Sequence, residues 1–285
     1  MRPFEYFAPE SVEEACTLLE MLDGGTKILA GGTDVLIELR KSGDDLPTDV
    51  IDISRISSLR GIEDAGDHVL IKPLTTHTEL LRSKVVSAFA PLLQSAVSSI
   101  GSPQIRNRGT IGGNIMNAAA CADTVPPLIA LGATMTLRSA RGERVVALSD
   151  FFVKPYVTAA QRNEILVEIR FPKLPVGART AFVKLGRRNA LSISRLSVAA
   201  ILVKDKTGVI TDARIVPGAV FPRWQRVPEA EGLILGKKPS RELFDQAGKK
   251  VSEVMISFTG RRWSTEYKEP VIAVLVRRAL EHCCS

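Results

Sequence analysis

The sequence predicts an α+β protein of two domains. Its 285 residues correspond to about two domains at roughly 100–200 residues each. Short helix and strand patterns alternate over residues 1–173, whereas strands come first and helices follow over residues 178–285. The run Pro172-Lys173-Leu174-Pro175-Val176-Gly177 between them is rich in turn-forming residues. We therefore expect one domain over 1–173 and a second over 178–285.

The first 55 residues predict a subdomain that begins with a helix. Ser11-Val12-Glu13-Glu14 fits a capping box, in which the serine accepts from a backbone N–H and the glutamate reaches back. Apolar residues then recur at helical spacing, and Asp23-Gly24-Gly25 is expected to end the helix. The remaining expected elements are strands at 27–30 and 50–53 and a helix at 35–41.

Residues 56–173 predict a second subdomain that contains a hairpin. Arg141-Gly142 separates two strand patterns, and Thr76-His77-Thr78-Glu79 fits another capping box. The stretch from Gly101 to Asn117 is polar and glycine-rich, and we expect a long functional loop there. The other expected elements are strands at 69–74, 134–138, 143–148 and 165–171 and helices at 92–100 and 126–131.

The second domain predicts a three-stranded sheet followed by helices. Lys206-Thr207-Gly208 is expected to turn between the second and third strands. Because the strands and helices are segregated along the chain, we expect a small, compact α+β domain. The strands are expected at 181–185, 196–204 and 210–216, and the helices at 228–235, 240–258 and 265–281.

The few cysteines and histidines limit the metal chemistry of this chain. Structural zinc and iron–sulfur clusters need about four close ligands, usually in paired spacings. The cysteines are scattered without a C-x-x-C pair, so we expect no metal site. An adjacent pair near the C-terminus suits a reducing compartment better than a disulfide framework, which predicts a cytoplasmic protein. The four cysteines are Cys16, Cys121, Cys283 and Cys284.

The charge of the chain is its one skewed property. Subtracting 31 acidic from 38 basic residues leaves +7. The basic residues are mixed with acids and cluster only in pairs such as Arg187-Arg188 and Arg261-Arg262, which argues against nucleic-acid binding. A docking face for an acidic partner or an anionic cofactor stays open, as does a plain solvated surface. We expect no membrane span, because the longest uncharged, largely apolar stretch, 125–137, is shorter than the roughly 20 residues needed.

Two loops with glycine pairs are the strongest functional signal: Gly31-Gly32-Thr33-Asp34 and Gly109-Thr110-Ile111-Gly112-Gly113-Asn114. A phosphate needs several backbone N–H donors at close range, and a Cβ would block its approach. Helix N-termini and threonine hydroxyls add donors. Two such loops suit an extended diphosphate held from two sides, although glycine pairs also occur in plain tight turns. Neither a G-x-G-x-x-G after a strand nor a P-loop motif is present.

No side chains form a convincing nucleophile–base set. Cys121 has no nearby histidine in the sequence and is expected to be a small buried hydrophobe. His77 lies at a helix start among threonines, where we expect a structural or exposed side chain. We therefore expect no catalytic residue and infer that a cofactor supplies the chemistry.

The chain resembles, from end to end, the FAD-binding (medium) subunit of the molybdenum hydroxylases, the xanthine dehydrogenase and carbon monoxide dehydrogenase family. The resemblance implies a p-cresol methylhydroxylase-type FAD-binding fold with two α+β subdomains, at about 1–55 and 56–173, and FAD between them and the C-terminal domain. Besides the two loops, the shared motifs are Phe4-Glu5-Tyr6 with Pro9, Lys27-Ile28-Leu29-Ala30, Gly101-Ser102-Pro103-Gln104-Ile105-Arg106-Asn107, Asp123, Phe182-Val183-Lys184, Arg187-Arg188, Ser264-Thr265-Glu266-Tyr267 and Arg277-Arg278-Ala279-Leu280.

The resemblance also implies which residues bind FAD. The first loop would contact the flavin and diphosphate through backbone groups, the second would close on the diphosphate, and Lys184 would lie near the flavin. Many relatives carry Asn-Ala-Ser-Pro-x-x-Asp where this chain has Asn117-Ala118-Ala119-Ala120-Cys121-Ala122-Asp123, so different hydrogen bonds are expected around Asp123. The implied contacts are Lys27, Ile28, Leu29, Ala30, Gly31, Gly32, Thr33, Asp34, Ile100, Gly101, Thr110, Gly112, Gly113, Asn114, Asp123, Leu166 and Lys184.

By this resemblance the chain is an electron-transfer flavoprotein subunit. Its FAD would collect electrons from a [2Fe-2S] small subunit and pass them to an external acceptor such as NAD+. A molybdopterin-containing large subunit would hydroxylate the substrate, and the three chains would assemble as a dimer of heterotrimers. The alternatives are a stand-alone FAD-dependent oxidase, which would need its own catalytic base, and a flavin-free assembly or nucleic-acid-binding module.

Overall fold

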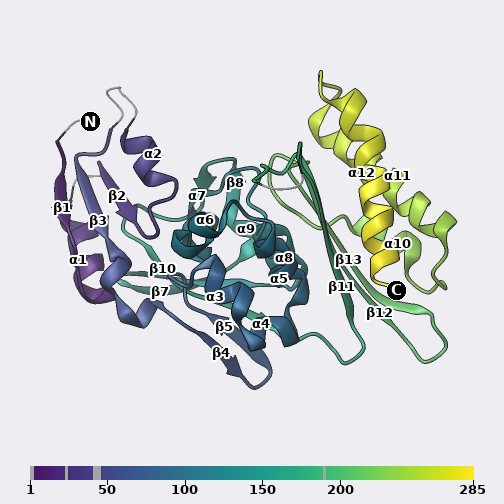
Figure 1. The fold of residues 1–285 in the computed structure, drawn as a ribbon, viewed down its shortest axis with the longest axis horizontal. Helices are drawn as coiled ribbons and strands as arrows, with labels where there is room; N and C mark the ends of the chain where they lie inside the picture. Colours follow the sequence, from purple (N-terminus) through teal and green to yellow (C-terminus); the bar gives the residue numbers. More distant parts are fainter. Residues whose placement is uncertain (1–2, 23–24, 41–45, 189–190) are drawn as a thin grey trace.

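The computed structural model describes residues 3–22, 25–40, 46–188 and 191–285. Its α+β chain runs from a small N-terminal sheet, through a central sheet covered by helices, to a C-terminal sheet and helix layer (Figure 1). This order confirms the predicted fold class. The cleft described below lies where these three parts meet.

The N-terminal part is a parallel sheet with strand order β1-β3-β2. Its helix α1 begins after Ser11, whose Oγ accepts from the Glu14 N–H at 3.1 Å. The Glu14 carboxylate accepts from the Glu10 N–H at 3.0 Å, so only the serine half of the predicted capping box forms as expected. Residues 23–24 and 41 of the expected helix ends lie outside the described residues. The elements are β1 (Glu5–Phe7), α1 (Val12–Met21), β2 (Thr26–Leu29), α2 (Val35–Leu39) and β3 (Asp49–Asp52).

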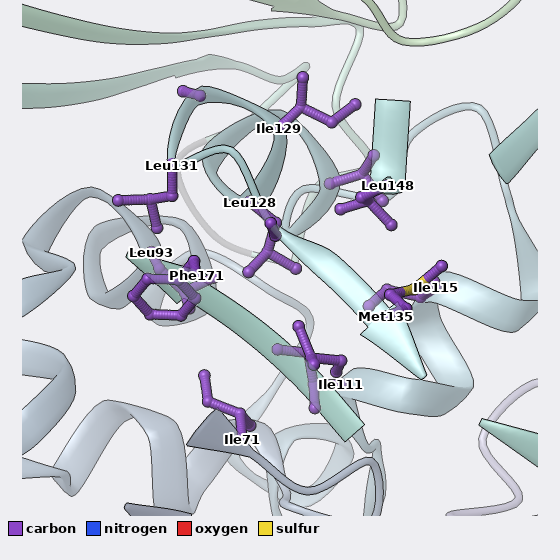
Figure 2. Close-up of a cluster of buried hydrophobic side chains, with 14 of the residues drawn as sticks. Ile71, Leu93, Ile111, Ile115, Leu128, Ile129, Leu131, Met135, Leu148 and Phe171 are labelled. Atoms are coloured by element: carbon purple, nitrogen blue, oxygen red, sulfur yellow. The ribbon is translucent and has the colours of Figure 1, made fainter. Parts of the chain in front are cut away.

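The central sheet is antiparallel, with strand order β4-β5-β10-β6-β7. The predicted hairpin and the Thr76 capping box are confirmed, because Thr76 and Glu79 cap each other. Figure 2 shows the core between this sheet and its helices, with Phe171 and Met135 from strands facing Leu93 and Ile115 from helices. The strands are β4 (Ile62–Ala65), β5 (His68–Ile71), β6 (Thr134–Ser139), β7 (Gly142–Ala147) and β10 (Ile165–Pro172).

The expected long loop over 101–117 is wrong, because the segment folds into two short helices. Ser102 caps α6 (Pro103–Arg108) and Thr110 caps α7 (Ile111–Asn117) through their hydroxyl oxygens. Proline in the first turn of α6 also favours a helix start, and these signals outweigh the glycine content. The other helices here are α3 (His77–Arg82), α4 (Lys84–Phe89), α5 (Pro91–Ser98), α8 (Val125–Ala130) and α9 (Leu148–Phe151).

Several short elements were not expected from the sequence. Besides β1, β4, α4 and α9, they are the 3-10 helices η1 (Ile53–Arg55) and η2 (Ser57–Leu59) and the small hairpin of β8 (Phe152–Lys154) and β9 (Val157–Thr158). Their length explains the omission, since two to six residues are too few to show a hydrophobic period.

The C-terminal part confirms the expected three strands and three helices. Its middle strand β12 (Leu196–Lys204) is buried on both faces, which its nearly unbroken apolar sequence reflects. Ala199 and Ile201 join the core of the central sheet, whereas Val198 and Leu202 join the core beneath the C-terminal helices. The other elements are β11 (Arg179–Leu185), β13 (Ile210–Gly218), α10 (Pro228–Ile234), α11 (Arg241–Thr259) and α12 (Thr265–His282).

Among the described residues we looked for membrane-spanning helices and metal-binding groups. None of the helices there is both long enough and apolar enough to cross a membrane. Nor do three or more His, Cys, Asp or Glu side chains in that part of the chain gather into a metal-binding group. The four cysteines are free thiols.

Candidate functional site

A cleft of about 570 Å³ lies between the N-terminal sheet, the central helices and the C-terminal sheet. Its walls combine the β2–α2 turn, the segment from α5 to α8, the residues before β10 and the connection from β11 to β12. Leu29 is the one expected contact residue that does not line it. Those that do are Lys27, Ile28, Ala30, Gly31, Gly32, Thr33, Asp34, Ile100, Gly101, Thr110, Gly112, Gly113, Asn114, Asp123, Leu166 and Lys184.

The first glycine loop is the turn between β2 and α2. A Cβ on Gly31 would lie 1.9 Å from the Arg108 carbonyl oxygen, so glycine is required there by contact between two backbones. Gly32 has a φ of +80°, which glycine adopts without strain. The backbone N–H groups of residues 31–34 donate to no acceptor in the described part of the chain. They form a row of donors free to bind an anionic ligand.

The second glycine loop has its donors already engaged. The Ile111 N–H donates to the Thr75 carbonyl at 3.0 Å and the Gly112 N–H to the Pro73 carbonyl at 2.9 Å. Thr110 accepts from the N–H of Gly113, at 3.1 Å through its hydroxyl, and from the N–H of Asn114, at 3.0 Å through its carbonyl. The expectation that both loops offer free N–H groups is therefore wrong for residues 111–114. This loop lines the cleft with side chains and glycine Cα atoms instead.

The Gly112 position shows a further reason for glycine in this loop. A Cβ there would lie 2.5 Å from the Pro73 Cβ and 2.8 Å from the Pro73 carbonyl oxygen. The next residues are also fixed, because the fully buried Thr124 hydroxyl donates to the Asn114 side-chain oxygen at 2.7 Å. The loop is thus held on one side by Pro73, which follows β5, and on the other by Thr124, which precedes α8.

A buried ion pair in the cleft wall joins the central part of the chain to the C-terminal part. Lys184 Nζ, on β11, lies 2.7 Å from Asp123 Oδ2 and donates to the Ser99 carbonyl at 2.9 Å. Ser194, before β12, donates to Asp123 Oδ1 at 2.5 Å. The two charged side chains are only 12% and 6% exposed. Burial raises the pKa of Asp123, while Lys184 and Ser194 act in the opposite direction.

The other charged side chains of the cleft wall differ in their exposure. Lys27 Nζ lies 2.7 Å from Glu38 Oε2, and both side chains are half-exposed. Burial raises the pKa of Asp34, and the nearby Glu38 charge adds to the effect. Glu164 is buried and paired with Arg144 at 2.5 Å, a hydrogen bond that lowers the pKa of the carboxyl.

His77 lines the cleft and is only 3% exposed. Its backbone N–H donates to the Gly109 carbonyl at 3.0 Å, while its Nδ1 has no hydrogen-bond partner among the described residues. Burial, together with the Arg106 charge, lowers its pKa to about 4. The side chain is therefore neutral at pH 7 and brings no positive charge to the cleft.

Sequence reasoning missed several other cleft residues. Cys121 is half-buried at the cleft wall rather than fully buried as expected, and burial raises the pKa of its thiol. No spacing pattern links the remaining residues to the glycine loops, because tertiary packing alone brings them there. They include Tyr156, Gln161, Arg162, Leu191, Ser192 and Ile193.

Two family models together span nearly the whole chain. Residues 2–174 match the FAD binding domain in molybdopterin dehydrogenase. Residues 181–283 match the CO dehydrogenase flavoprotein C-terminal domain.

Curated relatives and solved structures agree with these matches. The chain is 34% identical to the carbon monoxide dehydrogenase medium chain of Hydrogenophaga pseudoflava, over 97% of this chain and 96% of the relative. It is 31% identical to the nicotine 6-hydroxylase medium subunit of Paenarthrobacter nicotinovorans, over 96% and 95%. Its fold superposes with a TM-score of 0.91 on carbon monoxide dehydrogenase from Hydrogenophaga pseudoflava lacking the Mo-pyranopterin moiety, at 34% identity over 100% and 99% of the two chains.

Burial of neutral His77 should make stability depend on pH. An unfolded histidine binds a proton below about pH 6.5, whereas His77 in the folded chain stays neutral down to about pH 4. The stabilisation is complete above pH 6.5 and falls toward pH 4, by about 3 kcal/mol in all. His77→Gln should therefore flatten the pH dependence of the free energy of urea unfolding. The exposed His282→Gln control should leave the slope unchanged, and equal slopes for both variants would contradict the prediction.

Removing Lys184 should leave an unpaired acid in the interior. We expect Lys184→Met to lower the free energy of unfolding by about 3–5 kcal/mol, the cost typical of breaking a buried pair. Adding Asp123→Asn to this variant should restore part of the loss, because the orphaned charge disappears. Lys250→Met is the control, since its pair with Glu253 is exposed and is worth about 0–1 kcal/mol. Equal losses for Lys184→Met and Lys250→Met would rule out this role.

Proposed function

The chain belongs to the family of FAD-binding medium subunits of the molybdenum hydroxylases, and on this basis we propose that it is the electron-transfer flavoprotein of such a complex. Its cleft would hold FAD, with residues 1–173 as the FAD-binding domain and residues 178–285 as the C-terminal domain. When bound, FAD supplies a carrier that takes up electrons one at a time and releases them in pairs. The residues of this chain bind, orient and shield it.

The observation that carries this proposal is the row of unengaged N–H groups over residues 31–34. Four successive donors in a turn suit a negatively charged diphosphate, which needs several hydrogen bonds at short range. The second loop lines the same cleft, and its missing Cβ at Gly113 leaves room for a ligand. The first loop would thus bind the diphosphate and the second would shape the opposite wall.

The buried Lys184–Asp123 pair suggests that Lys184 has a positioning role. Its ammonium group already donates to Asp123 and to the Ser99 carbonyl. Such a saturated cation contributes little net charge to a flavin nearby, since its partner carboxylate offsets it. Lys184 would instead fix the cleft wall that the C-terminal domain provides.

The complex would contain two further kinds of subunit. We infer a molybdopterin-containing large subunit and a [2Fe-2S] small subunit, because the relatives are the medium chains of such enzymes. We further propose that two heterotrimers form a dimer and that NAD+ is the external electron acceptor. The cytoplasmic location stays a prediction from the unpaired cysteines.

Bound FAD is the direct test. The purified chain, released by denaturation, should show the visible flavin spectrum at close to one FAD per chain. Substrate turnover should require the partner subunits, because the chain itself would only carry electrons. A colourless protein would overturn the proposal, and turnover by the isolated chain would favour a stand-alone oxidase.

Gly113→Val should abolish FAD retention. A Cβ at this position would meet only Thr110 Oγ1 within 4 Å, so a branched side chain would extend into the cleft. We expect FAD content to fall at least tenfold, with a smaller loss of stability in the cofactor-free chain because the Thr110 hydroxyl, 2.9 Å from the new Cβ, must shift. Gly232→Ala is the control, because a Cβ there meets no atom within 4 Å and the position lies outside the cleft. Full FAD content in Gly113→Val would contradict the assignment of this loop.

A further inference from the structure

Exposed aromatic side chains gather at the turn between α11 and α12, which lies at the upper end of the C-terminal part in Figure 1. Trp263, in the turn itself, is 92% exposed, and Phe258 and Tyr267 on either side are also exposed. Single exposed hydrophobic residues are ordinary, but here three aromatic residues are exposed within ten positions, on two helix ends and the turn between them. Tryptophan and tyrosine are typical of the residues that dominate protein interfaces.

Positive charge surrounds these aromatic residues. The Arg195 guanidinium lies 5.3 Å from the centre of the Tyr267 ring. Lys268 is half-buried, and its Nζ donates to the Ala219 carbonyl at 2.9 Å. Burial lowers its pKa, and the charges of Arg262 and Arg195 act in the same direction. Two acids follow at the start of α12, Glu266 and Glu269, and Glu269 is already paired with Arg261. The α11–α12 patch, as we call it, comprises Phe258, Arg261, Arg262, Trp263, Tyr267, Lys268 and Arg195.

The α11–α12 patch is continuous with the cleft. Leu191 and Ile193 line the cleft and are both exposed. The next residue, Ser194, donates to Asp123 inside the cleft, and the one after it, Arg195, lies over Tyr267 in the patch. A protein seated on the patch would therefore lie beside the cofactor cleft.

We propose that the α11–α12 patch docks an acidic surface of the iron–sulfur partner subunit. This inference rests on the proposed function, since it names the partner that delivers electrons to the cleft. Electron transfer requires a donor close to the flavin, and the patch borders the cleft. The charge of the patch fits a partner that presents carboxylates and an apolar pocket for Trp263. A second copy of this chain fits less well, because a two-fold contact would press the same cations together.

Two substitutions in the full, FAD-loaded chain test the surface. Trp263→Ala removes the aromatic anchor, and Arg262→Glu reverses one charge of the patch. Each should weaken binding to the separately purified iron–sulfur subunit at least tenfold at low salt. The loss for Arg262→Glu should shrink as salt rises, because screening removes its electrostatic part. Titration calorimetry at two salt concentrations measures both effects.

Matched controls separate docking from folding. Val176→Ala removes another fully exposed apolar side chain. Lys238→Glu reverses the charge of one exposed lysine in the C-terminal part. Neither lies in the patch, and both should bind the iron–sulfur subunit as tightly as the unchanged protein. All four variants should keep their FAD content and melting temperature. At subsaturating partner, flavin reduction by the reduced iron–sulfur subunit should slow tenfold only in the two patch variants, whereas reduction by dithionite should not change.

Three outcomes would overturn the docking surface: patch variants that bind the iron–sulfur subunit normally, a loss confined to the molybdenum subunit, or a change only in self-association. Failure of the proposed function looks different. In that case the unchanged chain would purify without FAD, whatever its partners. An FAD-loaded chain with unaffected patch variants contradicts the surface alone.

Discussion

The Asp123 carboxylate joins the central and C-terminal parts of the chain at the cleft, and the geometry of the site depends on it. Lys184 and Ser194, both from the C-terminal part, donate to its two oxygens, and Lys184 also donates to the Ser99 carbonyl. One buried acid thus fixes three separated chain segments. Because burial disfavours its charged form, the acid is stable there only while these donors remain. The contacts of Asp123 with Lys184 and Ser194 therefore both join the central part to the C-terminal part and form one wall of the cleft.

Glycine serves two different purposes at the other walls. At Gly31 and Gly112 the space that a Cβ would occupy is filled by the Arg108 carbonyl and by Pro73, so these glycines allow protein backbones to pack closely. At Gly113 a Cβ would meet little besides the Thr110 hydroxyl, and the free space belongs to the cleft. The Gly31 contact joins the first loop to the start of the second, whereas the Gly112 contact fixes the second loop against Pro73. Both loops therefore line the same cleft.

Local signals predicted most of the fold, whereas the cleft needed tertiary information. The Thr76 capping box, the hairpin at Arg141-Gly142 and the apolar run of β12 are each decided by neighbouring residues, and all three are confirmed. The high glycine content of 101–117 favours a loop, yet Ser102 and Thr110 cap two helices there. His77 lines the cleft through packing against Gly109, and no sequence period reports such a contact. The resemblance to a family placed residues at the cleft that local patterns could not.

The cleft and the α11–α12 turn differ in whether their polar groups have partners within the chain. In the cleft, Lys184 and Glu164 are bound by partners and His77 is neutral, so these groups are held in place rather than free to exchange protons. At the α11–α12 turn, by contrast, Trp263 is exposed and the Arg195 guanidinium lies over the exposed Tyr267 ring, features that suit the acidic partner that we propose. The turn therefore has exposed groups that can bind a partner, whereas the charged groups of the cleft already have partners within the chain. An electron carrier of the kind that we propose would need this arrangement: a cofactor site whose charged groups have partners, beside a surface that can bind another subunit.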